Sequence, residues 1–99
     1  MSGGTFDYKQ YAITEIIEKL EQVLEEQGKP NPDYGRYDWE PELLRNDSEN
    51  VQMVIREGIH ALKKAQIFAQ RIDWYLAGDD GEESLFKRLA EELEQLENL

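Results

Sequence analysis

The chain has 99 residues, no cysteine and a formal net charge of −11 at pH 7. This length is typical of one domain whose core is marginal for a monomer. The lack of cysteine excludes disulfides and thiolate metal sites, and it fits an intracellular protein. Asp and Glu outnumber Lys and Arg by 22 to 11, so direct binding to nucleic acid is not expected.

The apolar runs are too short to span a membrane, and the N-terminal sequence lacks the basic start and apolar run of a signal peptide. We therefore expect a cytoplasmic protein. Residues 1–99 are expected to form a single all-α domain.

Residues 1–7 are predicted to be a flexible lead, followed by a first helix at about 8–27. The apolar face of this helix carries Ile13, Ile16, Ile17, Leu20, Val23 and Leu24. Gly28 favours the left-handed backbone that closes a helix, and Pro30 forbids its continuation. Three aromatic residues lie near the start: Phe6, Tyr8 and Tyr11. Aromatic rings near a terminus usually pack on something, so this end is expected to be held against the body of the domain.

Residues 28–47 form a connector that is rich in turn formers. A connection of this length is uncommon in a small domain unless it packs or functions. Tyr34, Tyr37 and Trp39 would otherwise lie in water. We therefore predict a long loop that wraps the helices.

The second helix is predicted at about 48–77, with Asp47 or Ser48 as its N-cap and Gly78 at its end. Its main seam alternates four and three residues: Val51, Ile55, Gly58, Leu62, Ala65, Ala69, Ile72 and Leu76. A heptad row widens the seam: Val54, Ala61, Phe68 and Tyr75. A further stripe lies on the opposite side: Met53, His60, Ile67 and Trp74. A helix that is apolar on two sides is usually buried on two sides, so this second stripe predicts self-association into an oligomeric helical bundle.

The last helix is predicted at about 82–98, with Asp80 or Ser84 as a possible cap. Its apolar stripe consists of Leu85, Leu89, Leu93 and Leu96. Glu82 and Glu83 suit its positive N-terminal end. The expected fold is thus an all-α, three-helix domain that forms a homo-oligomer.

The cations of the second helix suggest a binding site for a nucleotide-like anion. Arginine pairs with phosphate through a forked geometry, and aromatic rings can stack on a base. The candidate ligand-binding residues are Tyr8, Lys9, Tyr11, Arg56, His60, Lys64, Arg71 and Trp74. The alternative interpretation is that these cations pair with glutamates of neighbouring helices, as surface cations commonly do.

Glu57 and His60 have the Glu-x-x-His spacing that places two metal ligands on one helical face. His60 is the sole histidine, so these residues are weak metal candidates and no metal or other cofactor is predicted. Nucleophilic catalysis has little support, because there is no cysteine and no serine partner for His60 is evident. No enzyme activity is expected.

Two segments carry a resemblance to known proteins. The opening Gly3–Tyr11, GGTFDYKQY, and the run Arg71–Ser84, RIDWYLAGDDGEES, together resemble uncharacterised small proteins of bacteriophages and prophages. The resemblance covers both ends of the chain but not the connector. It implies a phage-type accessory protein in the bacterial host cytoplasm, and such proteins often bind host factors or sequester signals.

The leading hypothesis is therefore a non-enzymatic binding protein, active against host defence, that sequesters a nucleotide-like anionic signal at an oligomeric helical interface. A second hypothesis is an acidic interaction module that blocks a basic or nucleic-acid-binding host protein. A third is a metal-binding helical bundle.

Overall fold

The computed structural model describes residues 6, 9–37 and 39–98. They form three helices, α1 (Tyr11–Glu25), α2 (Glu49–Leu76) and α3 (Glu82–Glu97), and no named strand occurs among the described residues. The predicted all-α, three-helix fold is confirmed, with helix boundaries within three residues of those expected. Within this described part of the chain, no helix combines the length and apolarity needed to cross a membrane.

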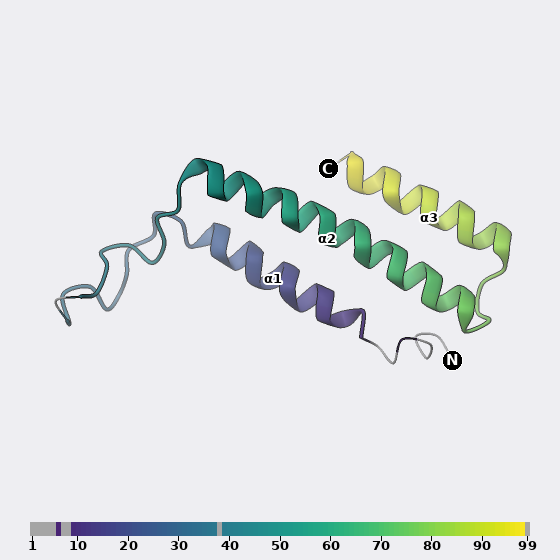
Figure 1. The fold of residues 1–99 in the computed structure, drawn as a ribbon, viewed down its shortest axis with the longest axis horizontal. Helices are drawn as coiled ribbons and strands as arrows, with labels where there is room; N and C mark the ends of the chain where they lie inside the picture. The colour runs from purple at the N-terminus through teal and green to yellow at the C-terminus, as the bar shows by residue number, and fades with distance from the viewer. Residues whose placement is uncertain (1–5, 7–8, 38, 99) are drawn as a thin grey trace.

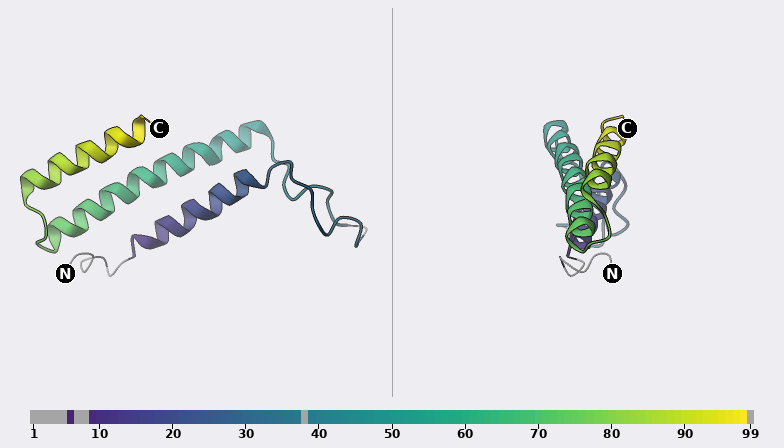
Figure 2. Two further views of the ribbon diagram at one scale, coloured as in Figure 1. Left: turned by 180° about the vertical axis from the view of Figure 1, so that it is seen from behind. Right: turned by 90° about the vertical axis from the view of Figure 1, so that its right-hand side faces the viewer.

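The three helices form an open layer rather than a closed bundle. α2 lies in the middle, with α1 packed along one side and α3 along another (Figure 1). α1 and α3 lie on different sides of α2 and do not pack against each other along their lengths (Figure 1), and the molecule measures 59 × 28 × 15 Å. Figure 2 shows the layer from behind and along its edge. Such an arrangement buries little: among the described residues, the buried apolar side chains are Ile17, Ile59 and Leu96, exposed by 5–8%.

The segment before α1 is held to the far end of α2, as predicted for this end of the chain. The Phe6 backbone N–H donates to Asp73 Oδ1 at 3.0 Å. The Gln10 side-chain amide donates to Asp73 Oδ2 and to Gln70 Oε1, each at 3.3 Å. Asp73 is completely buried, so its carboxylate joins two parts of the chain that are more than sixty residues apart. Tyr8 lies outside the described residues.

The ends of α2 have the predicted caps. The Ser48 hydroxyl accepts a hydrogen bond from the Val51 N–H at 3.2 Å. At the other end, Gly78 has a φ of 86°. Its N–H donates to the Tyr75 carbonyl, and the Asp79 N–H donates to the Trp74 carbonyl. This pair of bonds is the Schellman motif, which requires a left-handed residue and therefore favours glycine.

The predicted cap of α3 is wrong. Gly81 occupies the N-cap position and no side chain caps the helix, so neither Asp80 nor Ser84 has that role. The Asp80 carboxylate instead turns towards Arg71, with Oδ2 at 3.9 Å from Nη1. Glu82 and Glu83 do lie in the first turn of α3, where the helix dipole favours negative charge.

The connector forms an arm that extends past the ends of α1 and α2 (Figure 1). Its two halves pair through backbone hydrogen bonds, including Gly28 N–H to Arg45 O at 3.0 Å and Leu44 N–H to Lys29 O at 2.9 Å. This irregular hairpin directs the chain away from the helices.

The three rings of the arm are exposed: Tyr34 by 59%, Tyr37 by 52% and Trp39 by 74%. The prediction that they pack against the helices is therefore wrong. Tyr37 and Trp39 instead stack on each other with ring centroids 5.2 Å apart, which shields part of each ring without help from the helices.

The two apolar sides of α2 are not used as predicted. α3 packs along the stripe that was assigned to self-association: His60 Nε2 lies 3.4 Å from Glu97 Oε1, and Ile67 shares a hollow with Leu96. The row assigned to the internal core is open instead, with Val54 67% and Tyr75 40% exposed. Charge decides between the two sides, because Arg71 lies beside the stripe and binds Glu92 of α3.

Candidate functional site

The described residues that were predicted to bind ligand do not meet in one pocket. They are Lys9, Tyr11, Arg56, His60, Lys64, Arg71 and Trp74; Tyr8 lies outside the described residues. Arg56 and Arg71 are fifteen residues apart on α2, which is about 22 Å along a helix axis. One nucleotide-sized ligand does not bridge that distance. The structure separates the set into residues at the two ends of α2, while Lys64 is exposed between them.

Arg71 and Trp74 form one group, and it fastens α3 to α2. The Arg71 guanidinium lies 4.5 Å from the centroid of the Trp74 ring. Its Nε donates to Glu92 of α3, and its Nη1 lies near Asp80. The side chain is only 13% exposed. For Arg71, the alternative of a cation paired with neighbouring carboxylates is correct.

Arg56 and His60 form a second group in a cavity of about 410 Å³ to which all three helices contribute. The lining consists of Glu21, Leu24, Arg56, Ile59, His60, Lys63 and Leu96. Ile59 and Leu96 are buried, so the cavity has an apolar floor. Its remaining rim carries the cations of α2 and one glutamate of α1.

The basic side chains around this cavity form only weak interactions with neighbouring carboxylates. Lys63 Nζ lies 3.6 Å from Glu21 Oε2, with both side chains at least a third exposed. His60 Nε2 lies 3.4 Å from Glu97 Oε1, also at the surface, and this contact is an ion pair only when the imidazole is protonated. Pairs of this kind stabilise a protein by roughly 0–1 kcal/mol. Arg56 is exposed and forms no ion pair with any described residue. An incoming anion could therefore bind these side chains at small cost.

Lys63 was not among the predicted ligand residues, although it belongs to this site. The signal was present in its spacing, because Lys63 follows Ile59 by four residues and Arg56 by seven, which places all three on one helical face. The rim also continues along α2. A second hollow of about 360 Å³ shares Lys63 and Leu96 with the first and extends towards Ile67 and Glu92. The two hollows make a groove along α2, which we call the central groove.

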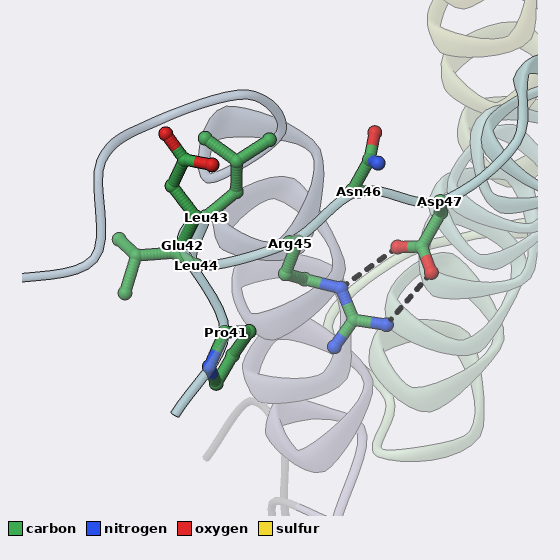
Figure 3. Close-up of a pocket in the computed structure, with 7 residues that line it drawn as sticks. All are labelled: Pro41, Glu42, Leu43, Leu44, Arg45, Asn46 and Asp47. Atoms are coloured by element: carbon green, nitrogen blue, oxygen red, sulfur yellow. Dashed lines mark hydrogen bonds and ion pairs between the residues drawn. The ribbon is translucent and has the colours of Figure 1, made fainter. Parts of the chain in front are cut away.

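A further hollow lies within the arm. It measures about 470 Å³ and is lined by one continuous stretch, Pro41–Asp47. In Figure 3 the Arg45 side chain reaches along the chain to Asp47; Nε and Nη2 donate to its two carboxylate oxygens at 2.8 and 3.1 Å. These hydrogen bonds, together with one from Gln27, hold the pKa of Asp47 below its ordinary value. The cation here is neutralised, so this hollow is a weaker candidate for anion binding.

The metal candidates Glu57 and His60 gain no further ligand. Among the described residues, no group of three or more His, Cys, Asp or Glu side chains is arranged to hold a metal ion. The His60 imidazole faces Glu97 instead.

The chemistry of the central groove follows from its lining. Cations above an apolar floor suit a ligand that has an anionic group and a flat or apolar body. The lining of the 410 Å³ cavity contains no serine, threonine or cysteine that could act as a nucleophile. No protein-family model, curated protein or solved structure matches this chain.

Proposed function

We propose that the protein acts by binding, without catalysis, and that it captures a nucleotide-like anion in the central groove. The observation that carries this proposal is the convergence of Arg56, His60 and Lys63 over the apolar floor formed by Ile59 and Leu96. In a chain whose net charge is −11, this cluster supplies two cations, Arg56 and Lys63, beside an apolar surface.

The dimensions and polarity of the cavity support a small ligand. Pockets for small molecules usually measure about 300–1,000 Å³ and combine apolar walls with a few polar groups. Arg56 and Lys63 would bind phosphate, while Ile59, Leu24 and Leu96 would contact the base. The acidic surroundings would repel long polyanions such as nucleic acid and leave the groove to short ones.

The biological role in this proposal comes from the resemblance to small phage proteins. A protein that sequesters a nucleotide signal in the host cytoplasm would act against a defence system that uses such a signal. Binding alone suffices for this role, so it requires no catalytic group.

Isothermal titration against a panel of linear and cyclic mono- and dinucleotides tests the proposal. At least one nucleotide should bind, and Arg56→Ala should weaken that binding at least tenfold. Arg36→Ala is the matched control, because Arg36 is an exposed arginine of the arm and should leave the affinity unchanged. Failure of a folded protein to bind any member of the panel would refute the proposal.

The arm supports a second candidate function, an acidic module that binds a basic protein. The stacked and exposed pair Tyr37–Trp39 provides the kind of aromatic anchor that is enriched at protein interfaces. In the arm, residues 28–47, five acidic residues outnumber three basic ones. This function predicts pulldown of a basic host protein that weakens at high salt and is lost in Trp39→Ala. Salt-insensitive binding, or retention by that variant, would count against it.

A further inference from the structure

One face of α2 is left open by both neighbouring helices. It is a heptad row whose members alternate three and four residues apart: Val51, Val54, Gly58, Ala61, Ala65, Phe68, Ile72 and Tyr75. We call this row the outer seam. Six of its eight members are exposed, including Val54 at 67% and Val51 at 46%. An apolar seam of this regularity is the pattern by which one helix packs against another.

We propose that the outer seam is covered by a second copy of the chain, whose α2 lies antiparallel to the first. The first reason is that the seam is complementary in shape to itself. The alignment that covers all eight positions gives four kinds of layer: Val51 with the partner's Tyr75, Val54 with the partner's Ile72, Gly58 with the partner's Phe68, and Ala61 with the partner's Ala65. The large Phe68 ring meets a glycine, and the centre contains only alanines, so the two helices can approach closely.

A parallel arrangement of the same seam fits less well. It would place Phe68 against the partner's Phe68 and Gly58 against the partner's Gly58, which crowds one layer and leaves a void in another. The rows that flank the seam lead to the same choice. One flank is apolar: Ile55, Leu62, Ala69 and Leu76. The other is polar: Asn50, Glu57, Lys64 and Arg71. In an antiparallel pair, the apolar flank of one α2 lies beside the apolar flank of the other. In a parallel pair, the apolar flank of each α2 would lie beside the polar flank of the other.

Charge complementarity supports the same alignment. Glu57 would lie level with the partner's Ala69, on the side of the interface that carries the partner's Lys64. Glu57 and Lys64 are both exposed, and neither forms an ion pair with a described residue of its own chain. The antiparallel arrangement also offsets the two acidic segments 79–98 from each other along the dimer, because each lies alongside the C-terminal part of its own α2. A parallel arrangement would place them together and increase repulsion.

The shortage of core in one copy supplies the driving force. With three buried apolar side chains among the described residues, a single layer of helices has little hydrophobic stabilisation. Packing two layers on their outer seams would convert two half-covered α2 helices into the centre of a common core. The central groove lies between α2, α1 and α3, so its lining is separate from the seam and this inference does not depend on the proposed function.

Light scattering after size exclusion tests the assembly. The native chain should have a mass of about 23 kDa, twice its 11.6 kDa. Ala61→Glu places two carboxylates at the centre of the seam and should weaken dimerisation at least a hundredfold. Ala90→Glu is the matched control, because Ala90 is an exposed alanine of α3 and its substitution should leave the dimer intact. A native monomer, a mass other than a dimer, or equal dimerisation by Ala61→Glu would overturn the proposal.

A distance measurement tests the orientation and does not require the disrupted variant to fold. Because the chain has no cysteine, Met53→Cys provides a unique site for a nitroxide label at an exposed position outside the seam. In the proposed alignment the two labels lie twenty helical positions apart, which is about 30 Å along the axis. A parallel pair would bring them to the same level. An electron spin distance well below 25 Å, roughly the axial value less label reach, would refute the antiparallel arrangement.

Discussion

The buried carboxylate of Asp73 provides a sharp test of how this open layer of helices is held together. Asp73 is completely buried and accepts hydrogen bonds from the Phe6 backbone at 3.0 Å and the Gln10 side chain at 3.3 Å. Asp73→Ala removes both acceptors, which leaves the Phe6 N–H without this partner and leaves the Gln10 amide with its bond to Gln70 Oε1 alone. Asp73→Asn keeps an oxygen for the Phe6 N–H.

The expected cost follows from the number and quality of these bonds. A hydrogen bond to a charged group contributes roughly 1.5–3 kcal/mol. The bond from Gln10 is long, and the substitution also removes the cost of burying the carboxylate. We therefore expect Asp73→Ala to reduce the free energy of unfolding by roughly 2–4 kcal/mol. For a domain of this size, that lowers Tm by about 8 °C or more. Asp73→Asn should cost less than half as much, because Gln10 Oε1 has no hydrogen-bond partner in the structure and a turned Gln10 amide can accept from the new Asn Nδ2.

Thermal and urea denaturation of the three proteins at one concentration provides the measurement. Asp79→Ala serves as the control, because Asp79 is an exposed aspartate six residues further along the chain and its substitution should cost less than about 0.5 kcal/mol. If Asp73→Ala were no more destabilising than Asp79→Ala, the hydrogen bonds from Phe6 and Gln10 would not anchor the N-terminal segment.

Three further outcomes are expected. Ser48→Ala removes the side-chain acceptor of the Val51 N–H and should cost about 1 kcal/mol in urea denaturation; an unchanged midpoint would mean that the hydroxyl does not cap α2. Gly78→Ala meets no neighbouring atom, so its cost should come from the left-handed backbone alone, about 1–2 kcal/mol, and a neutral effect would contradict that conformation. The lowered pKa of Asp47 means that its pairing with Arg45 stabilises the arm above the ordinary pKa of 3.8, and that this contribution disappears as the pH falls through the folded-state value. Titration of the Asp47 carboxylate by NMR should show this pKa moving back towards 3.8 in Arg45→Gln, and an unchanged pKa would assign the shift to another neighbour.

Local patterns were sufficient for the elements of the fold. The helical period and the positions of Gly28 and Pro30 predicted where α1 ends to within a few residues, because they act through the backbone of their own segment. Ser48 and Gly78 predicted the two ends of α2 for the same reason. The predicted cap of α3 was wrong because Asp80 has a competing partner. Arg71 lies near the Asp80 carboxylate in space, and no local sequence pattern reveals that pairing.

The candidate site was predicted only in part. Arg56 and His60 belong to the central groove, but Arg71 is held by Glu92 of α3. In the sequence, Arg56 and Arg71 look alike, since each is an arginine on the same long helix. Which of them remains accessible depends on where α3 packs, and that is a tertiary property.

Three helices, their approximate ends, and an α2 with more apolar surface than one partner can cover are all predictable from local sequence patterns. The side of α2 that receives α3, and the extension of the aromatic connector as an arm, depend on contacts between distant parts of the chain. The physical reason is that helix formation depends on neighbours within a few residues, whereas the choice between two apolar sides depends on contacts such as Arg71 with Glu92, whose energies are set by groups distant in sequence.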